Sequence, residues 1–497
     1  MKIKFAAWMV LLSIWGITGC ASSGRVQLLN VSGRPQDCAC LIDRLDQVII
    51  QNKVANAGAA RVNGFPYLRA DRFLSAIAPK NTNDRRFLDW LNLMRNKADY
   101  TIEKEILNLP PGAVERLAGE AQTQPERQAL IKNALDCNAI VFNHDIALEG
   151  YRDAVFSVIH VPHEYSFLMR AAGLYPIFSL PVAYLTYKAH KEFKGWFDTP
   201  ETELPVLGQL TCFVPKVTLS TPVNVPALFA LAQRNSFDMP LFSVAALEKL
   251  AFTFAPHLVQ DVSGTYDIPG KVTWQNAQVT IDTDKPTLYY YASYARLAGR
   301  TVIQMNYVAW FSAREGPFAP WIERGPLDGL TIRLTLDHMG TPLMLDIMNN
   351  CGCYHMLIPQ RDLVVKQKDK PFAIDAFIPQ SLPPEFPDSP LGLRINSGWH
   401  QVQQVTTYRE TTLPATAYTL LSYDELESLP QPDGRFESVF NHRGIMKDSW
   451  RIEPYILFSM GIPSVGVMRQ RGHHAIVLVG REYFDNPDLF DDSLVFK

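Results

Sequence analysis

Two cysteines and a histidine alternate in the segment MNNCGCYHML, residues 348–357. In an extended chain, side chains two residues apart point to the same face, so Cys351, Cys353 and His355 would share one face. Two thiolates and an imidazole suit zinc or copper(I). The same cysteines could instead close a disulfide, because Gly352 between them permits a tight bend. The spacing alone does not choose between a metal site and a disulfide.

The cellular compartment decides between these two chemistries, because exported thiols normally oxidise unless a metal already holds them. In an exported protein the sequence favours a disulfide between Cys351 and Cys353, with His355 as a packed or hydrogen-bonded neighbour. A zinc or copper site on these three residues, with His400 or His473 as a further ligand, is the alternative. No other cofactor is predicted.

The first residues, MKIKFAAWMVLLSIWGITGC, carry the features of an export signal. Lys2 and Lys4 precede an almost unbroken apolar run over 5–17. An apolar run of about 13 residues is too short to span a bilayer comfortably and is typical of a secretory signal peptide. We therefore expect residues 1–19 to be removed during export.

Ile17, Thr18, Gly19 and Cys20 close this segment. An aliphatic residue, two small residues and a cysteine resemble the lipobox of bacterial lipoproteins. The resemblance implies cleavage before Cys20, a diacylglycerol on its thiol and a further acyl chain, such as palmitate, on the new amine. Two or more acyl chains hold a protein stably on a membrane. Ala21, where an aspartate typically retains lipoproteins in the inner membrane, favours the outer membrane.

Six cysteines remain once Cys20 is lipidated, an even number for an oxidising compartment. Six cysteines allow fifteen pairings, and the sequence does not choose among them. Bonds within each C-x-C pair and bonds between the two pairs both stay open. The disulfide candidates are Cys38, Cys40, Cys137, Cys212, Cys351 and Cys353.

The composition is that of a globular protein without a preference for polyanions. The chain of 497 residues holds 47 basic and 50 acidic residues and is 47% hydrophobic. No block of basic residues occurs, which argues against nucleic acid as a partner. The length and apolar content suffice for two or three domains with sizeable cores.

The apolar pattern divides the mature chain into a helical and a β-rich part, as in an α+β protein. Apolar residues at helical spacing, as in LIDRLDQVII and DRRFLDWLNLMRN, predict a mostly helical domain over 41–200, after a tether over 20–40. The prolines of 198–226 indicate a boundary, so 201–265 is assigned to a proline-rich connection with further helices. Residues 266–497 form the predicted β-rich domain.

Alternating apolar and polar residues identify the strands of the β-rich part. The clearest pattern is LTIRLTLDHMGTPLMLDIM over 330–348, which predicts a strand, a turn and a second strand. RTVIQMNYVAWF, LGLRINSGWHQVQQV and HHAIVLVG are further strand candidates, and YRDAVFSVIHVP is one inside the helical part. The predicted architecture is an antiparallel β-sandwich-like domain, with the helical region packed on it or linked to it.

Within 288–402, VIQMNYVAWF and the hairpin LTIRLTLDHMGTPLML resemble two β-sandwich families, the yeast vacuolar-sorting-related proteins and the microbial necrosis-inducing proteins. The first family also has a later strand similar to LRINSGWHQV. The resemblance implies a β-sandwich. Both families carry a His–acidic–Trp cluster before the hairpin, which binds a cation in the toxins. Here the matching stretch IERGPLDGLTI offers only Glu323 and Asp328, so neither the cation site nor the toxin activity is carried over.

The segment YSFLMRAAGLYPIFSLPVAYLTY, residues 165–187, comes closest to a membrane span after the signal. Arg170, Pro176 and Pro181 interrupt it. We expect a buried helix pair, and the alternative is an interfacial helix lying on a lipid surface.

Several basic residues qualify as ligand-binding candidates. Arg469, Arg471 and His473 form a cationic group that would repel a metal but could receive a carboxylate or phosphate, although a solvated strand end is the simpler account. His160 and His163, three residues apart, are more simply explained as an exposed or hydrogen-bonded pair than as metal ligands.

The motifs of common enzyme classes are missing. The sequence has no phosphate-binding loop, dinucleotide fingerprint, H-E-x-x-H motif or nucleophile elbow. A carboxylate-based envelope hydrolase would draw on Asp328, Asp337 and Asp346, which nothing in the sequence sets apart. His400 follows a tryptophan and is expected to stack inside the β-rich domain.

The sequence therefore predicts a lipid-anchored lipoprotein of the bacterial outer membrane, held through Cys20. Its body would bind or organise another envelope protein or polymer without catalysis. The alternative is a metal-binding protein or a metal-dependent envelope enzyme that uses Cys351, Cys353 and His355.

Overall fold

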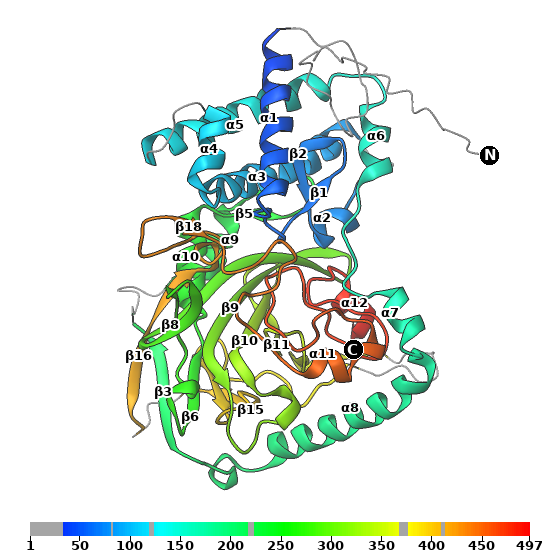
Figure 1. Ribbon diagram of the computed structural model, residues 1–497. Helices are drawn as coiled ribbons and strands as arrows, with labels where there is room; N and C mark the ends of the chain where they lie inside the picture. The colour runs from blue at the N-terminus through cyan, green and yellow to red at the C-terminus, as the bar shows by residue number, and fades with distance from the viewer. Residues whose placement is uncertain (1–32, 81–82, 119–123, 217–222, 367–375, 409–412) are drawn as a thin grey trace, which may run out of the picture.

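The computed structural model describes residues 33–80, 83–118, 124–216, 223–366, 376–408 and 413–497. The export signal, the lipobox and Cys20 lie outside these residues. Within the described chain, helices and strands are both abundant, as in an α+β protein. Figure 1 shows the first helices gathered at one end of a large curled sheet.

The amino-terminal layer consists of helices around one short hairpin. Its elements are α1 (Arg34–Gln51), β1 (Ala60–Val62), β2 (Phe65–Ala70), α2 (Arg72–Ala76), α3 (Asp84–Leu107), α4 (Pro111–Ala118), α5 (Gln124–Asp145) and α6 (Tyr151–Val158). Cys38 of α1 and Cys137 of α5 form a disulfide within the core of this layer. The tether predicted over 20–40 is too long, because α1 already begins at Arg34, with Pro35 in its first turn.

Helix α3 shows how an apolar stripe seats this layer. Asn83 caps the helix, its side-chain oxygen accepting a hydrogen bond from the amide of Arg86 at 3.0 Å. Trp90, Leu91 and Met94 are fully buried in the core shared with β2 and α5. Each side chain of this size contributes about 1.5–3 kcal/mol when it is removed from water.

The segment YRDAVFSVIHVP is mainly helical, as α6, so the predicted strand is wrong. Tyr151 and Val155 are its buried residues, and they are one helical turn apart. Asp153, midway between them, is exposed, although in a strand it would lie on the same face as the two buried residues. Burial at every fourth residue, without the residue between, is the pattern of a helix.

Two helices lie apart from the amino-terminal layer, α7 (Phe167–Ala172) and α8 (Tyr175–Asp198). In Figure 1, α8 runs along the side of the sheet opposite α1. The predicted helix pair is present, but its predicted burial is wrong, since the buried residues of α8 are Ser179 and Phe193 alone. Among the helices of the described ranges, none is long and apolar enough to cross a membrane.

The remaining chain supplies the sheet and the segments around it. Its helices are η1 (Glu201–Glu203), α9 (Val225–Leu231), α10 (Val244–Thr253), η2 (Thr265–Asp267), η3 (Trp321–Glu323), η4 (Tyr423–Glu425), α11 (Glu453–Ile456), η5 (Phe458–Met460) and α12 (Leu489–Ser493). Its strands are β3 (Gln209–Pro215), β4 (Gln233–Arg234), β5 (Pro240–Leu241), β6 (His257–Val262), β7 (Gly270–Gln275), β8 (Gln278–Leu297), β9 (Arg300–Arg314), β10 (Gly325–Leu336), β11 (Pro342–Asn349), β12 (Met356–Pro359), β13 (Leu363–Val365), β14 (Leu391–Ile395), β15 (Val402–Thr407), β16 (Ala415–Ser422), β17 (Leu429–Pro430), β18 (Phe436–Glu437) and β19 (Leu494–Phe496).

The main sheet has eleven strands in the order β12-β11-β10-β9-β8-β16-β3-β6-β14-β15, with β7 paired to β8. Strand β16 is parallel to both β8 and β3, and β14 is parallel to β6. The predicted hairpin over 330–348 is confirmed as β10 and β11. The antiparallel β-sandwich is not confirmed, because these strands join in one mixed, curled sheet (Figure 1).

Strand β9 explains why the sheet contains a continuous apolar run. Its residues from Thr301 to Phe311 are all buried. Ile303, Met305 and Tyr307 belong to one core, while Val308 and Trp310 belong to a second core on the other face. A strand that is covered on both faces has no solvent side, so it does not alternate.

Two further predictions fail in this part. The proline-rich stretch 198–226 contains β3, which pairs with β6 and β16 inside the sheet, and residues 217–222 of it lie outside the described residues. The segment HHAIVLVG is not a strand, since only Ala475 within it makes an isolated bridge, to Tyr483. Gly472 and Gly480 flank the segment with positive φ angles, 87° and 109°, so the chain turns at both ends.

Candidate functional site

The segment that carries Cys351, Cys353 and His355 is a turn between β11 and β12. Gly352 has a φ of 94°, and its amide donates a hydrogen bond to the carbonyl of Asn349 at 2.7 Å. The expectation of an extended chain is therefore wrong here. Nε2 of His355 lies 3.0 Å from Asp346. Within the described ranges, no three His, Cys, Asp or Glu side chains are grouped so that they could hold a metal ion.

Cys351 and Cys353 are hydrogen-bonded thiols, so the disulfide predicted between them is not formed in this structure. The hydrogen bond from Cys353 lowers the pKa of Cys351 to about 7, with burial opposing this shift and Arg314 adding to it. Among the described cysteines, Cys38 and Cys137 form a disulfide. The other two candidates are half-buried Cys40 on α1 and the buried thiol Cys212 on β3.

His400 lies at the centre of a buried group of charges, with no exposed surface. Its Nδ1 lies 2.7 Å from Asp328 and its Nε2 lies 3.3 Å from Asp267. Its ring stacks on Phe311 with the ring centres 3.9 Å apart, which confirms the predicted stacking. Arg314 donates two hydrogen bonds to Asp328, at 2.9 and 3.0 Å.

Glu323 completes this group, which we call the His400 cluster: Asp267, Arg314, Glu323, Asp328 and His400. Glu323 accepts a hydrogen bond from Arg314 at 2.6 Å and one from the indole of Trp399 at 2.9 Å. It also accepts a bond from Tyr354.

The electrostatics of the His400 cluster stabilise its charged forms. Burial alone would raise the pKa of Asp328, but Arg314 and His400 hold it well below its usual range. Burial alone would lower the pKa of His400, but Asp267 and Asp328 raise it. The cluster contains the right groups for proton transfer, yet its central residues have no exposed surface. We therefore assign it a structural role, tying η2, η3, β9, β10 and the β14–β15 turn together.

The other predicted carboxylates also serve the fold. Asp346 receives two hydrogen bonds from Arg333, at 2.6 and 2.9 Å, and is buried. Asp337 accepts the amides of Met339 and Thr341 at 2.8 and 2.7 Å, which closes the β10–β11 turn. Both carboxylates therefore have hydrogen-bond partners within the fold.

The predicted cationic group is divided between two acidic partners. Arg469 and His473 both contact Glu164, at 3.1 and 2.8 Å. Arg471 pairs with Asp424 and Glu427. The proposed anion site is therefore already occupied by the protein's own carboxylates. His160 and His163 lie edge to face, 5.7 Å between ring centres, and His163 contacts the hydroxyl of Tyr483.

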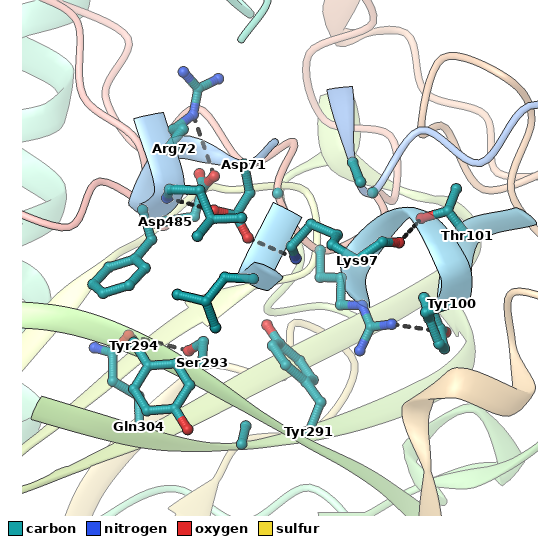
Figure 2. Close-up of a pocket in the computed structure, with 18 of the residues that line it drawn as sticks. Asp71, Arg72, Lys97, Tyr100, Thr101, Tyr291, Ser293, Tyr294, Gln304 and Asp485 are labelled. Atoms are coloured by element: carbon teal, nitrogen blue, oxygen red, sulfur yellow. Dashed lines mark hydrogen bonds and ion pairs between the residues drawn. The ribbon is translucent and has the colours of Figure 1, made fainter. Parts of the chain in front are cut away.

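Arg471 also lines a separate site, a pocket of about 390 Å³ between the amino-terminal layer and the sheet. Figure 2 shows α2 and α3 on one side and β8 and β9 on the other. Aromatic side chains supply much of its wall, including Phe73, Tyr291, Tyr294 and Phe484. The size falls within the range of small-molecule sites in proteins.

Charged residues line the pocket as pairs. Lys97 contacts Asp71 at 2.6 Å, and Arg72 contacts Asp485 at 3.2 Å. Arg471 contacts Asp424 at 2.8 Å, which makes a third ion pair in the pocket wall. The charged lining residues comprise four basic and four acidic side chains: Arg72, Lys97, Arg333 and Arg471, and Asp71, Asp424, Glu427 and Asp485.

Asp485 differs from the other acids of the pocket. Its Oδ1 is buried and has no hydrogen-bond partner among the residues that the structure describes, while its Oδ2 faces Arg72. Burial raises the pKa of this carboxyl to about 6, although Arg72 lowers it in part. The Asp485 side chain is 25% exposed and lines the pocket, so a bound molecule could donate a hydrogen bond to its accessible part.

The pocket residues are rigidly supported from both sides. Glu427 accepts hydrogen bonds from Tyr100 at 2.7 Å and Asn56 at 2.8 Å, both in the amino-terminal layer. It also accepts bonds from Gln470 and Arg471 at 2.9 and 3.0 Å. This network fixes the two walls relative to each other, as a preformed binding site requires.

The sequence identified only Arg471 among these pocket residues. Asp71 and Lys97 are 26 positions apart, and Arg72 and Asp485 are joined across most of the chain. No local spacing signals such a site. Compared with known proteins, the chain matches no family model, no curated protein and no solved structure.

Proposed function

We propose that this protein is a non-enzymatic, lipid-anchored binding protein of the bacterial outer membrane. Its ligand would occupy the pocket between the amino-terminal layer and the sheet. The observation that carries this proposal is the preformed pocket of about 390 Å³, which is lined by aromatic side chains and by the partly exposed carboxylate of Asp485. An accessible acceptor in the wall supports binding of a molecule that donates hydrogen bonds.

The chemistry of the wall narrows the ligand class. The four basic and four acidic lining residues balance, so the pocket does not favour a strongly charged ligand. Tyr291 and Tyr294, both partly exposed, offer aromatic surface, and Ser293 and Gln304 offer polar groups beside them. A neutral molecule with an apolar face and several hydroxyl donors fits both features. A saccharide of one or two rings combines them, and it agrees with the expected envelope polymer.

Calorimetric titration with glucose, N-acetylglucosamine, maltose and chitobiose tests this proposal. We expect one of these sugars to bind with a stoichiometry of one. Ala292→Phe places a ring in the pocket and should weaken binding about tenfold or more, because the ligand loses its space. Ala417→Phe, at an exposed position of β16, is the matched control. Failure of all four sugars to bind, or equal binding by Ala292→Phe, would contradict the saccharide assignment.

Anchorage through Cys20 is tested separately. Cys20→Ala should abolish incorporation of labelled palmitate and leave the body folded, because the acylated thiol and the processing site are lost. Inhibition of lipoprotein signal processing should produce a larger precursor. Undiminished palmitate labelling of Cys20→Ala would count against the lipoprotein assignment.

A further inference from the structure

Helices α7 and α8 expose an unusual number of large apolar side chains. Phe167 and Leu168 of α7 are each 76% exposed. On α8, Ile177, Leu180 and Tyr184 are 62%, 64% and 67% exposed. We call this surface, the apolar side chains of residues 167–187, the α7–α8 patch. A soluble surface rarely gathers so many exposed apolar residues without a binding role.

The α7–α8 patch is firmly mounted on the body. Arg170 is buried, and its guanidinium donates to the carbonyls of Met460 at 2.8 Å and Gly480 at 2.5 Å. The amide of Ser166 donates to the carbonyl of Gly461 at 2.7 Å. Tyr455 of α11, which contacts η5 beside α7, is 76% exposed and extends the apolar surface. The exposed side chains are therefore held outward by a fixed platform.

Polarity changes in one direction along α8. Ile177, Leu180 and Tyr184 follow each other at helical spacing on one face, and Lys188 and Lys191 continue the same face. Both lysines are exposed, and the sequence holds no acid between Glu164 and Glu192. From Ile177 to Lys191 this gradient covers about 21 Å, at 1.5 Å per residue.

We propose that the α7–α8 patch docks on the surface of an anionic phospholipid bilayer. Aliphatic side chains at the amino-terminal half of α8 would enter the acyl boundary, Tyr184 would lie at the interface, and Lys188 and Lys191 would meet the phosphates. The order of residues along α8 matches the order of polarity across one leaflet. This docking is independent of the ligand pocket and of acylation at Cys20.

The charges beside the α7–α8 patch favour a lipid bilayer over a second copy of the chain as its binding partner. Interfaces between proteins are depleted of lysine, whereas helices that bind anionic lipid carry lysine beside the apolar face. Lys188 and Lys191 directly continue the apolar face of α8. The surface therefore fits a bilayer with negative headgroups better than a protein partner.

Vesicle flotation of the full chain carrying Cys20→Ala tests the proposal, with vesicles of phosphatidylethanolamine and phosphatidylglycerol and, for comparison, of phosphatidylcholine. Leu168→Asp with Leu180→Asp should reduce binding to the anionic vesicles about tenfold or more, because two apolar anchors become charged. Leu231→Asp with Val244→Asp, at positions 86% and 80% exposed on α9 and α10, is the matched control and should bind like the parent. All variants keep the signal, so its contribution cancels.

The charge requirement is tested by Lys188→Gln with Lys191→Gln. Each lysine should contribute about fivefold to binding of the anionic vesicles and nothing to binding of the neutral ones. Hydrogen exchange of the Cys20→Ala chain should slow over 166–187 when anionic vesicles are added, which locates the contact without a patch variant.

Three outcomes would overturn the proposal. One is equal flotation of the patch pair and the control pair. Another is unchanged exchange over 166–187 on addition of anionic vesicles. The third is a dimer in sedimentation velocity that Leu168→Asp with Leu180→Asp dissociates without changing vesicle binding, which would assign the patch to self-association.

Discussion

Two groups of charged residues in this protein contain the same residue types, but the pKa values of their aspartates shift in opposite directions. In the His400 cluster, Arg314 and His400 hold the pKa of Asp328 below its usual range against the effect of burial. In the pocket, burial prevails and raises the pKa of Asp485 to about 6 despite its contact with Arg72. The Asp328 carboxylate has hydrogen-bond partners on Arg314 and His400, whereas one oxygen of Asp485 has none within the described part of the chain.

This difference shows what an unusual pKa indicates. The buried charges of the His400 cluster are satisfied by one another and join five elements of the fold. Burial disfavours the charged form of the Asp485 carboxylate, which lies beside an accessible cavity. A ligand bound in this cavity can stabilise that charged form. Accessibility and unsatisfied hydrogen bonding, rather than the number of titratable groups, distinguish the candidate binding site.

The largest expected effect is that of Arg314→Met. The variant leaves Asp328 and Glu323 buried without their shared cation, so the free energy of unfolding should fall by about 3–5 kcal/mol. Urea denaturation measures the loss. Lys194→Met breaks an exposed pair with Asp198 and should change stability by less than about 0.5 kcal/mol. Equal effects of the two variants would show that the His400 cluster does not hold the fold together.

His400→Gln tests the same cluster through its pH dependence. The pKa of His400 is raised on folding, so its charge contributes stability that is complete below about pH 6.5 and is lost as pH rises through the folded pKa. At pH 5.5 the variant should be less stable by about 2–3 kcal/mol, the size of a charged hydrogen bond, and the difference should shrink at alkaline pH. His338→Gln, at an exposed turn, should show neither effect. A pH-independent difference would mean that His400 is neutral in the folded protein.

Short-range sequence patterns correctly predicted the elements whose formation depends on neighbouring residues. The hairpin of β10 and β11 and the stripes of α1 and α3 follow from short-range periodicity. The sheet order does not, because β16 is inserted between β8 and β3 by pairing residues more than 100 positions apart. The strand prediction at HHAIVLVG was wrong, because within the described residues this β-branched segment makes only an isolated bridge, from Ala475 to Tyr483.

The candidate site was even less accessible from the sequence. The alternation of Cys351, Cys353 and His355 had meaning only for an extended chain, and the left-handed conformation of Gly352 turns the chain there. The pocket combines residues from Asn56 to Asp485, whose proximity is created by packing. Its most informative group, Asp485, has no sequence context that separates it from other surface acids.

Asp485→Asn should stabilise the protein, the opposite of the effect in the His400 cluster. The pKa of Asp485 is raised from its usual value near 4 to about 6, so folding is penalised as pH rises through this window. At pH 8 the variant should gain about 1 kcal/mol, because removing the charge that burial disfavours outweighs the loss of the ion pair with Arg72. Below about pH 4 the gain should vanish. Thermal unfolding across this range measures it, with exposed Asp284→Asn as the control. Destabilisation at pH 8 would place Asp485 with the structural carboxylates.

Lys97→Met should change the free energy of unfolding least among these four variants. It also distinguishes the pocket from the His400 cluster most clearly. Lys97 and Asp71 are 32% and 28% exposed, so water can solvate the carboxylate that loses its cation. Asp71 also keeps its hydrogen bond from the amide of Leu74 at 2.8 Å, which caps α2. The free energy of unfolding should therefore change by no more than about 0.5 kcal/mol. The saccharide that binds the wild-type pocket should bind the variant about fivefold more weakly, because one polar group of the wall is gone, while Lys97→Arg should retain binding. A loss of 2 kcal/mol or more, on the scale that breaking a buried ion pair produces, would show that the pocket rim supports the fold as the His400 cluster does.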